Sequence, residues 1–220
     1  MRIIEDLFNI IAPHQCLVCL AEGSLLCQAC TDKISKIPER CYRCGRRNEG
    51  FRTCAACRRH SPLYSVWAVT GYEGAAKDIV HAIKFARAKA GAAVMASLIH
   101  QCPLPTDVLI AYVPTAPQRV RERGYDQAAL IAKELAIRSK LPYHTLLART
   151  GTQRQLGQQR AVRKEQMTGA FRSLDKIDLQ GKHVLLIDDV LTTGATCEAA
   201  ARALRQAGAK RVSAAVFAVA

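Results

Sequence analysis

The sequence has few acidic residues, few aromatic residues and no long apolar run. Its 220 residues include 18 Asp and Glu against 32 Lys and Arg, and 5% of them are aromatic. No segment approaches the roughly 18 to 20 apolar residues that cross a bilayer. The first residues, MRIIEDLFNIIAP, predict a short amphipathic helix whose apolar core is too short for a secretory signal. We therefore expect no membrane span and no export, but a cytoplasmic protein whose thiols stay reduced.

The length and the apolar content predict one core with a small appendage. Half of the residues are hydrophobic, and single domains usually run to about 100 to 200 residues. A polar break at His60, Ser61 and Pro62 separates a cysteine-rich front from the rest of the chain. We predict an N-terminal helix and cysteine module over residues 1–62 and a larger domain over residues 63–220.

Eight of the ten cysteines form four CxxC pairs. The pairs are Cys16 with Cys19, Cys27 with Cys30, Cys41 with Cys44, and Cys54 with Cys57. A CxxC turn places two thiolates at adjacent corners of a zinc tetrahedron, and two such turns complete a closed site. The eight thiolates therefore predict two structural zinc ions. A disulfide framework and a redox dithiol are the competing interpretations, which the expected cytosolic location disfavours.

The spacing alone does not decide which pairs share an ion. Neighbouring pairs would form two successive ribbons, whereas alternating pairs would form one cross-braced module. The short loops between neighbouring pairs favour the successive arrangement. Cys102 and Cys197 stand apart and are interpreted as small apolar residues in helices.

The positive charge is concentrated in two segments. The formal net charge is +14, or about +10 once two Zn²⁺ and eight thiolates are counted. Arginines crowd residues 40–59, and a second basic group lies within residues 149–172. Such surfaces attract polyanions, and a solvated face that keeps the protein soluble is the simpler alternative. The candidate nucleic-acid-binding residues are Arg46, Arg47, Arg58, Arg59, Arg154, Arg160 and Arg163.

The stretch HVLLIDDVLTTGAT, residues 183–196, carries the most specific pattern. Its apolar run predicts a strand buried on both faces of a parallel sheet, with Asp188 and Asp189 at the carboxyl end. The turn after it leaves backbone N–H groups aimed at one point at the positive end of a helix dipole, where a phosphate binds. The two acids suit hydrogen bonds from sugar hydroxyls. The pattern predicts a sugar-phosphate site; an ordinary strand-to-helix turn with an acidic N-cap is the simpler alternative.

The rest of the chain predicts alternating strands and helices. We expect strands over residues 63–72, 108–113 and 212–220, helices over residues 75–85, 90–100 and 126–139, and a last helix that ends at Gly208. Residues 114–124 read as a rigid basic loop. Residues 147–171 are rich in Gln, Gly, Arg and Thr, which suits a loop that closes over an anion.

VLLIDDVLTTGAT resembles the phosphoribosyl pyrophosphate (PRPP) motif of type I phosphoribosyltransferases. With the cysteine pairs, the Lys84–Phe85 step, PxxxxRxxxRGYDQA and RTGTQRQLGQQRAVRKEQMTGAF, nearly the whole chain resembles the ComF (GntX-like) proteins. Asp126 and Gln166 stand where that family usually has asparagine. The other matching positions are Arg119, Arg123, Gly124, Gln127, Thr152, Gln155, Arg163, Gly169, Ala170 and Phe171.

This resemblance implies a fold and a site. The fold would be α/β, type I phosphoribosyltransferase-like, with a mainly parallel sheet, helices on both faces and a preceding zinc-ribbon module. Asp188 and Asp189 would be the catalytic residues that hold the ribose, and Mg²⁺ would accompany PRPP. The ribose and its 5′-phosphate would also contact Leu191, Thr192, Thr193, Gly194, Ala195 and Thr196. Pyrophosphate would contact Lys84, Pro114, Arg119, Arg123 and Gly124.

Two functions follow from these patterns. The first, which the ComF resemblance implies, is a PRPP-binding protein that contacts single-stranded DNA in DNA uptake during natural transformation, with competence proteins as candidate partners. The second is an active Mg²⁺-dependent phosphoribosyltransferase that moves ribose 5-phosphate from PRPP to an unidentified acceptor. Because the last predicted strand ends the sequence, we expect the hood over the acceptor to come from the zinc module.

Overall fold

The computed structural model describes residues 14–85, 89–150, 169–174 and 177–220. The predicted N-terminal helix and Arg154, Arg160 and Arg163 lie outside these ranges. The described elements are α2 (Gln28–Thr31), the 3₁₀ helix η1 (Glu49–Phe51), α3 (Ala55–Arg58), β1 (Val66–Gly71), α4 (Gly74–Phe85), α5 (Gly91–His100), β2 (Leu109–Tyr112), α6 (Pro117–Arg123), α7 (Gln127–Ser139), β3 (Leu147–Arg149), β4 (Phe171–Ser173), β5 (His183–Leu191), α9 (Ala195–Gln206) and β6 (Arg211–Val219).

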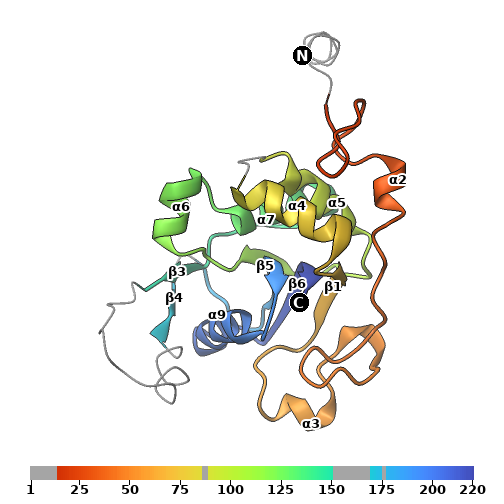
Figure 1. The fold of residues 1–220 in the computed structure, drawn as a ribbon. Helices are drawn as coiled ribbons and strands as arrows, with labels where there is room; N and C mark the ends of the chain where they lie inside the picture. The colour runs from red at the N-terminus through yellow and green to blue at the C-terminus, as the bar shows by residue number, and fades with distance from the viewer. Residues whose placement is uncertain (1–13, 86–88, 151–168, 175–176) are drawn as a thin grey trace, which may run out of the picture.

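The centre of the molecule is a parallel sheet with the strand order β1-β6-β5-β2. Helices α4, α5 and α7 lie on one side of it and α9 lies on the other (Figure 1). A parallel sheet needs such cover on both faces, which is why its central strands are apolar almost throughout. The predicted α/β class, with a mainly parallel sheet and helices on both faces, is confirmed.

Strand β5 divides its side chains between two hydrophobic cores. Leu185 and Ile187 join the core that includes α4, α5 and α7, whereas Val184 and Leu186 join the core around α9. This alternation follows from the two-residue period of a strand. All four side chains are completely buried, so the middle of β5 is held rigidly from both faces.

The sheet has a step at its carboxyl edge. Pairing between β2 and β5 ends at Tyr112 opposite Ile187, whereas pairing between β5 and β6 continues to Leu191 opposite Val219. The prediction that the strand ends at the two acids was therefore wrong. Asp188 and Asp189 lie inside β5, and the early end of β2 leaves them open on one side.

Two further segments differ from the prediction. The basic stretch after β2 was predicted as a loop, but it contains helix α6, because Pro117 suits the first helical turn and Gly124 ends the helix with φ 84°. The segment predicted as a closing loop begins and ends in the antiparallel pair of β3 and β4. Its middle, residues 151–168, lies outside the described ranges.

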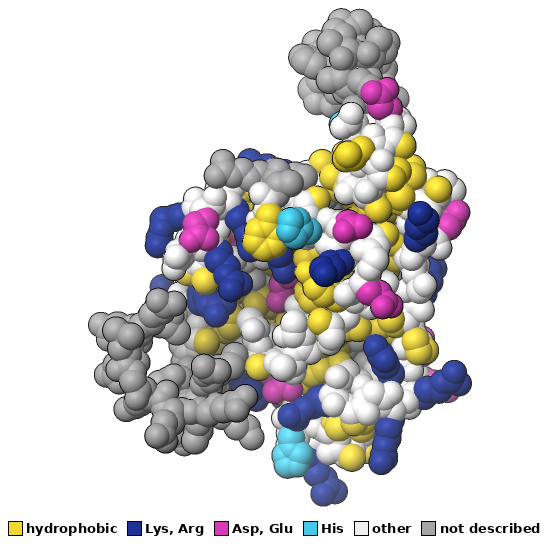
Figure 2. All heavy atoms as spheres, viewed as in Figure 1, with side chains coloured by type: hydrophobic (Ala, Val, Ile, Leu, Met, Phe, Trp, Pro, Cys, Tyr) yellow, Lys and Arg dark blue, Asp and Glu magenta, His cyan; other side chains and the backbone are white. Residues whose placement is uncertain are grey.

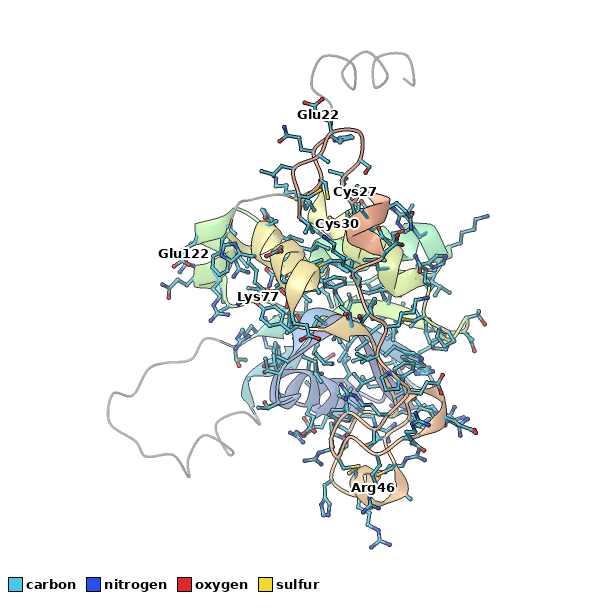
Figure 3. All side chains as sticks on the ribbon, turned by 45° about the vertical axis from the view of Figure 1, so that its right-hand side comes forward. Glu22, Cys27, Cys30, Arg46, Lys77 and Glu122 are labelled. Carbon is cyan, nitrogen blue, oxygen red and sulfur yellow. The ribbon has the colours of Figure 1, made fainter. Side chains whose placement is uncertain are left out.

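The cysteines form two units, which we name the first cysteine unit (residues 14–37) and the second cysteine unit (residues 38–62). The first packs Leu17, Leu25 and Leu26 on the core of the α5 side, and the second packs Tyr42 on the core of the α9 side. Cys27 and Cys30 lie near one end of the molecule and Arg46 at the other (Figure 3). Within the described ranges, no helix combines the length and the apolar character that a bilayer crossing requires.

Candidate functional site

The carboxyl edge of the sheet carries a cavity of about 520 Å³. Parallel strands place their carboxyl ends at one edge, and loops from several strands therefore meet there. Segments after β1, β2 and β5 all contribute, as do α4, α6, α7 and β3. The lining residues are Tyr72, Lys84, Val113, Pro114, Thr115, Ala116, Arg119, Gln127, Arg149, Asp188, Asp189, Val190, Thr192, Thr196 and Ala220.

Asp189 is buried and held by a cation from another element. The Nζ atom of Lys84, in the last turn of α4, lies 2.9 Å from Asp189 Oδ2. The Nε2 group of Gln127 donates a longer bond of 3.4 Å to the same oxygen, and Arg123 donates to Gln127 Oε1 at 2.7 Å. This network fixes the Asp189 carboxylate from the side of α4, α6 and α7.

Asp188 lies in a more repulsive environment. Its Oδ1 accepts the Asp189 backbone N–H at 2.9 Å, and the Cys197 thiol lies 3.8 Å from its Oδ2. Burial, followed by the negative charge of Asp189, raises the pKa of Asp188 well above its usual value. A ligand that offers hydroxyl donors or a cation would relieve this cost by stabilising the ionised carboxylate.

Two arginines face the cavity without a carboxylate partner among the described residues. Burial, and then the charge of Arg119, lower the pKa of Arg149. The Nη1 group of Arg149 donates to the backbone oxygen of Pro114 at 3.4 Å, which is a long and therefore weak hydrogen bond to an uncharged acceptor. An anion between these guanidinium groups would replace repulsion by attraction.

The amino end of α9 has no side-chain cap and adjoins the cavity. Gly194 is the N-cap residue, with φ 77°, and no side chain caps the helix. The Ala195 N–H makes only a long bond of 3.4 Å to the Thr193 hydroxyl. Thr192 and Thr196 line the cavity, and the first amides of a helix have no partner within it. This end of the cavity therefore suits a phosphate, and the acids suit the sugar beside it.

The cysteines group in the successive arrangement, as the short loops predicted. One cluster contains Cys16, Cys19, Cys27 and Cys30, and the other contains Cys41, Cys44, Cys54 and Cys57; within each, all sulfurs lie within 4.8 Å of one another. The Cys19–Cys27 and Cys44–Cys54 sulfur pairs are both 3.6 Å apart. Zinc–sulfur bonds of about 2.3 Å at tetrahedral angles place sulfurs roughly 3.8 Å apart. Either cluster could therefore hold a zinc ion.

Comparison with known proteins relates the larger domain, and the chain over most of its length, to proteins of known name. The model of the phosphoribosyl transferase domain matches residues 121–219. DNA utilization protein YhgH of Salmonella typhi is 28% identical over 91% of this chain and 94% of its own length. Competence protein F of Haemophilus influenzae is 27% identical over 85% of this chain and 87% of its own, and Competence protein ComFC of Bacillus subtilis is 26% identical over 87% and 82%. Over most of its length the chain is similar to these DNA utilization and competence proteins, and it contains a phosphoribosyl transferase domain.

Among solved structures, the chain is similar to glutamine phosphoribosylpyrophosphate amidotransferase from B. subtilis. The TM-score is 0.41 and the sequence identity is 20%, over 57% of this chain and 25% of that one. The chain thus spans a quarter of that enzyme's length.

The structure brings most of the residues predicted to bind PRPP together. Both acids, three of the predicted pyrophosphate residues and two threonines line the cavity: Asp188, Asp189, Lys84, Pro114, Arg119, Thr192 and Thr196. Arg123 lines an adjoining pocket of about 480 Å³ instead, and Gly124 ends α6. Leu191 and Gly194 are buried, and Thr193 is exposed. Of the predicted nucleic-acid residues, Arg46, Arg47, Arg58 and Arg59 are exposed on the second cysteine unit.

Sequence reasoning missed two residues of the site. Arg149 faces the cavity from β3, although the sequence showed it only as one member of a basic group. Cys197 was interpreted as a small apolar residue, yet its thiol contacts Asp188. Its position was the available signal, because Cys197 lies in the first turn of α9, directly after the loop of residues 192–194 that joins β5 to α9. We name this loop the phosphate-type loop.

The departure at Asp126 has a structural explanation. Its Oδ1 accepts the N–H groups of Ala128 and Ala129, which caps α7, and its Oδ2 accepts the Thr115 N–H at 2.8 Å. The Thr115 hydroxyl adds a further bond of 3.0 Å. Asp126 therefore anchors the loop after β2, and these donors stabilise its negative charge.

Proposed function

We propose that this chain binds PRPP at the carboxyl edge of its sheet. One observation carries the proposal: a single cavity joins an uncapped helix amino end, two adjacent acids, and the cations Lys84, Arg119 and Arg149. That order matches the 5′-phosphate, the ribose and the pyrophosphate of the ligand. A small neutral ligand would leave both the helix end and the arginines unused.

Magnesium ion fits the same site. Asp188 and Asp189 offer carboxylate oxygens, the ligands that Mg²⁺ prefers, and pyrophosphate would supply the others. When bound, Mg²⁺ neutralises charge on the pyrophosphate. The residues of the chain then orient the ligand: the amides of α9 hold the phosphate, and the acids hold the ribose hydroxyls.

We further propose that the two clusters hold structural zinc, with four thiolates and no open position each. The geometry of each cluster carries this proposal. Within the clusters, burial and then the neighbouring thiols raise the pKa of Cys30 to about 12, and the Cys54 thiol and then burial raise that of Cys57 to about 12, whereas Cys16 and Cys41 differ. Burial raises the pKa of Cys16 and of Cys41, but hydrogen bonds from backbone N–H groups have the larger combined effect and lower each pKa to about 6. The donors are Cys27, Cys19 and Val18 for Cys16, and Cys54, Cys44 and Arg43 for Cys41. Thiolate sites of this kind fit a reducing, cytoplasmic compartment. The division at residue 62 remains our proposal for the domain boundary.

The names of the relatives, DNA utilization protein and competence protein, lead us to propose a role in DNA uptake with contact to single-stranded DNA. The surface supports this: Lys and Arg side chains surround the second cysteine unit, in the lower right of Figure 2. Arg46, Arg47 and Arg59 are exposed there. Exposed arginines on one face attract a phosphate backbone.

Calorimetry with PRPP and Mg²⁺ tests the binding site. We expect Asp188→Asn and Asp189→Asn to weaken binding at least about tenfold, and Asp78→Asn, an exposed residue on α4, to leave it unchanged. Equal binding by all three variants would refute the proposal. The same samples, assayed for pyrophosphate release with nucleobases and amines, distinguish a binding protein from a phosphoribosyltransferase. Release that depends on an acceptor and disappears in both site variants would establish the enzyme.

Strand binding at two salt concentrations tests the DNA contact. We expect the triple variant Arg46→Gln/Arg47→Gln/Arg59→Gln to bind more weakly, with a salt slope smaller by about 2. Arg58 is kept, because its guanidinium donates to Thr53 O and lies over the Tyr64 ring. A variant that removes the same number of charges from α7 and its C-cap, Lys133→Gln/Arg138→Gln/Lys140→Gln, serves as the control. Equal loss in both variants would mean that net charge, and not this surface, binds DNA.

A further inference from the structure

The second cysteine unit contacts the phosphate-type loop through one side chain. Tyr42 follows Cys41 directly, and its hydroxyl donates to Glu198 Oε1 at 2.6 Å. The same hydroxyl lies 2.5 Å from Ser61 Oγ, at the end of the unit. Glu198 lies in the first turn of α9, directly after the loop. Tyr42 therefore joins the turn of a four-cysteine cluster to the helix whose amino end faces the cavity.

The Tyr42 ring also covers the back of the loop. A Cβ atom added at Gly194 would lie 2.9 Å from Tyr42 Cε2 and 3.3 Å from Cδ2. Gly194 is buried and has φ 77°, so both its conformation and its contact with the ring require glycine. The ring thus limits how far the loop can move away from the cavity.

The contact with the second cysteine unit also supplies partners for the Glu198 carboxylate. This carboxylate is 7% exposed and lies in the first turn of α9, where a phosphate would bind. Arg43 Nε, from the second cysteine unit, lies 3.4 Å from its Oε1, and Arg202 Nη2 lies 3.3 Å from its Oε2. An unpaired carboxylate at this place would repel the ligand. Two of its three partners come from the second cysteine unit.

The first cysteine unit has a different role. Its Leu17 approaches Gly91 at the start of α5, 3.5 Å from the position of an added Cβ. Its apolar residues pack on the core opposite α9. Loss of metal from this unit would therefore disturb packing at α5 and leave the phosphate-type loop in place.

We propose that Tyr42 is a positioning residue for the 5′-phosphate loop, so that the second four-cysteine cluster sets the affinity of the site for the phosphorylated end of its ligand. The inference rests on the proposed PRPP site. It gives the two clusters separate functions: one supports the fold beside α5, and the other holds a binding loop in its working conformation.

Calorimetry on the full-length, zinc-loaded chain with ribose 5-phosphate tests this role. We expect Tyr42→Phe, which keeps the ring, to weaken binding about threefold to tenfold, and Tyr42→Leu, which removes it, to weaken binding more than tenfold. In Tyr42→Phe the Glu198 carboxylate loses one of its three partners; adding Glu198→Gln removes this carboxylate charge and should restore affinity to within about threefold. Inorganic pyrophosphate, expected at the other end of the cavity, should bind all variants within about twofold, which general unfolding would not allow.

Cluster variants provide the second comparison. Cys54→Ser in the second cluster should weaken binding of ribose 5-phosphate about tenfold, whereas Cys27→Ser in the first should change it less than twofold. Zinc content and circular dichroism show that each variant has lost one ion and remains folded. If Tyr42→Leu fails to fold, Tyr42→Phe with its Glu198→Gln partner decides. Unchanged affinity in Tyr42→Phe and Cys54→Ser, or equal loss in Cys27→Ser, would overturn the inference. If the wild-type chain binds neither PRPP nor ribose 5-phosphate, the proposed function itself fails.

Discussion

The Nζ atom of Lys84 lies 2.9 Å from Oδ2 of Asp189, and this ion pair joins the end of α4 to the middle of β5. Asp189 is 4% exposed, so its negative charge is stabilised by this cation, by the Val190 N–H at 2.6 Å and by Gln127. The pair also brings an ammonium group to the place where we expect the pyrophosphate. Lys84 thus serves the apo fold and the ligand in turn.

We expect Lys84→Met to lower the free energy of unfolding by about 2 kcal/mol, because it leaves the buried Asp189 carboxylate without a cation, with only the Val190 N–H and the long Gln127 bond as donors. PRPP affinity should fall at least about tenfold. A double-mutant cycle with Asp189→Asn, measured by urea unfolding, isolates the pair and should give a coupling of at least about 1 kcal/mol. Additive effects of the two substitutions would show that the ion pair contributes nothing to stability.

Asp188 should make apo stability fall as pH rises. Its pKa in the folded state is raised by burial and by Asp189, so between the ordinary pKa of an aspartate and the raised one the folded state binds more protons than the unfolded state. Asp188→Asn should therefore raise the melting temperature by about 2 °C or more at pH 8, and by less near pH 4, while it weakens PRPP binding. A melting temperature that is lower for the variant at pH 8 would contradict this assignment.

Asp126 should stabilise the fold through its hydrogen bonds to the loop after β2 and to the start of α7 more than through its negative charge. Asp126→Ala removes the N-cap of α7 and the acceptor of Thr115, at a cost of about 2 kcal/mol in unfolding free energy. Asp126→Asn keeps one acceptor oxygen but turns a donor toward the Thr115 N–H, at about 1 kcal/mol. Equilibrium unfolding gives the ranking. An Asn variant less stable than the Ala variant would show that the Thr115 contact is not what Asp126 provides.

The first CxxC turn of each cysteine unit is followed by a different residue, Leu20 after Cys19 and Gly45 after Cys44, and this difference gives a test of backbone strain. The N–H of Leu20 donates to Cys16 O and that of Gly45 to Cys41 O, each at 2.9 Å, and both residues have positive φ, 63° and 71°. Leu20 is 68% exposed, so its side chain contributes little packing. Leu20→Gly should stabilise the zinc-loaded protein by about 0.5 to 1 kcal/mol, and Gly45→Leu should destabilise it by about 1 to 2 kcal/mol. Urea unfolding of both variants checks the opposite signs, and a destabilised Leu20→Gly would contradict the strain argument.

The amino-acid sequence determined the local features. The apolar run at residues 184–187 requires a buried strand, the short loops between CxxC turns favour neighbouring pairs, and Gly194 with its threonines shapes a loop before a helix. These features depend on backbone preference and on spacing within a few residues, which a sequence expresses directly. The order of the four sheet strands and of α4, α5, α7 and α9 was predicted for the same reason, whereas α6, β3 and β4 were not.

The tertiary structure decided which of these features meet. Lys84 reaches Asp189, Tyr42 reaches Glu198, and Asp126 turns toward Thr115, because packing brings together elements distant in the chain. The early end of β2 opens one side of the acid pair, and this end depends on the register of the sheet, which no local pattern contains. The basic stretch after β2 became helix α6 although its composition resembled a loop. Chemistry at the site thus follows from sequence, and its geometry from the pairing of strands and the packing of the two cysteine units against the domain.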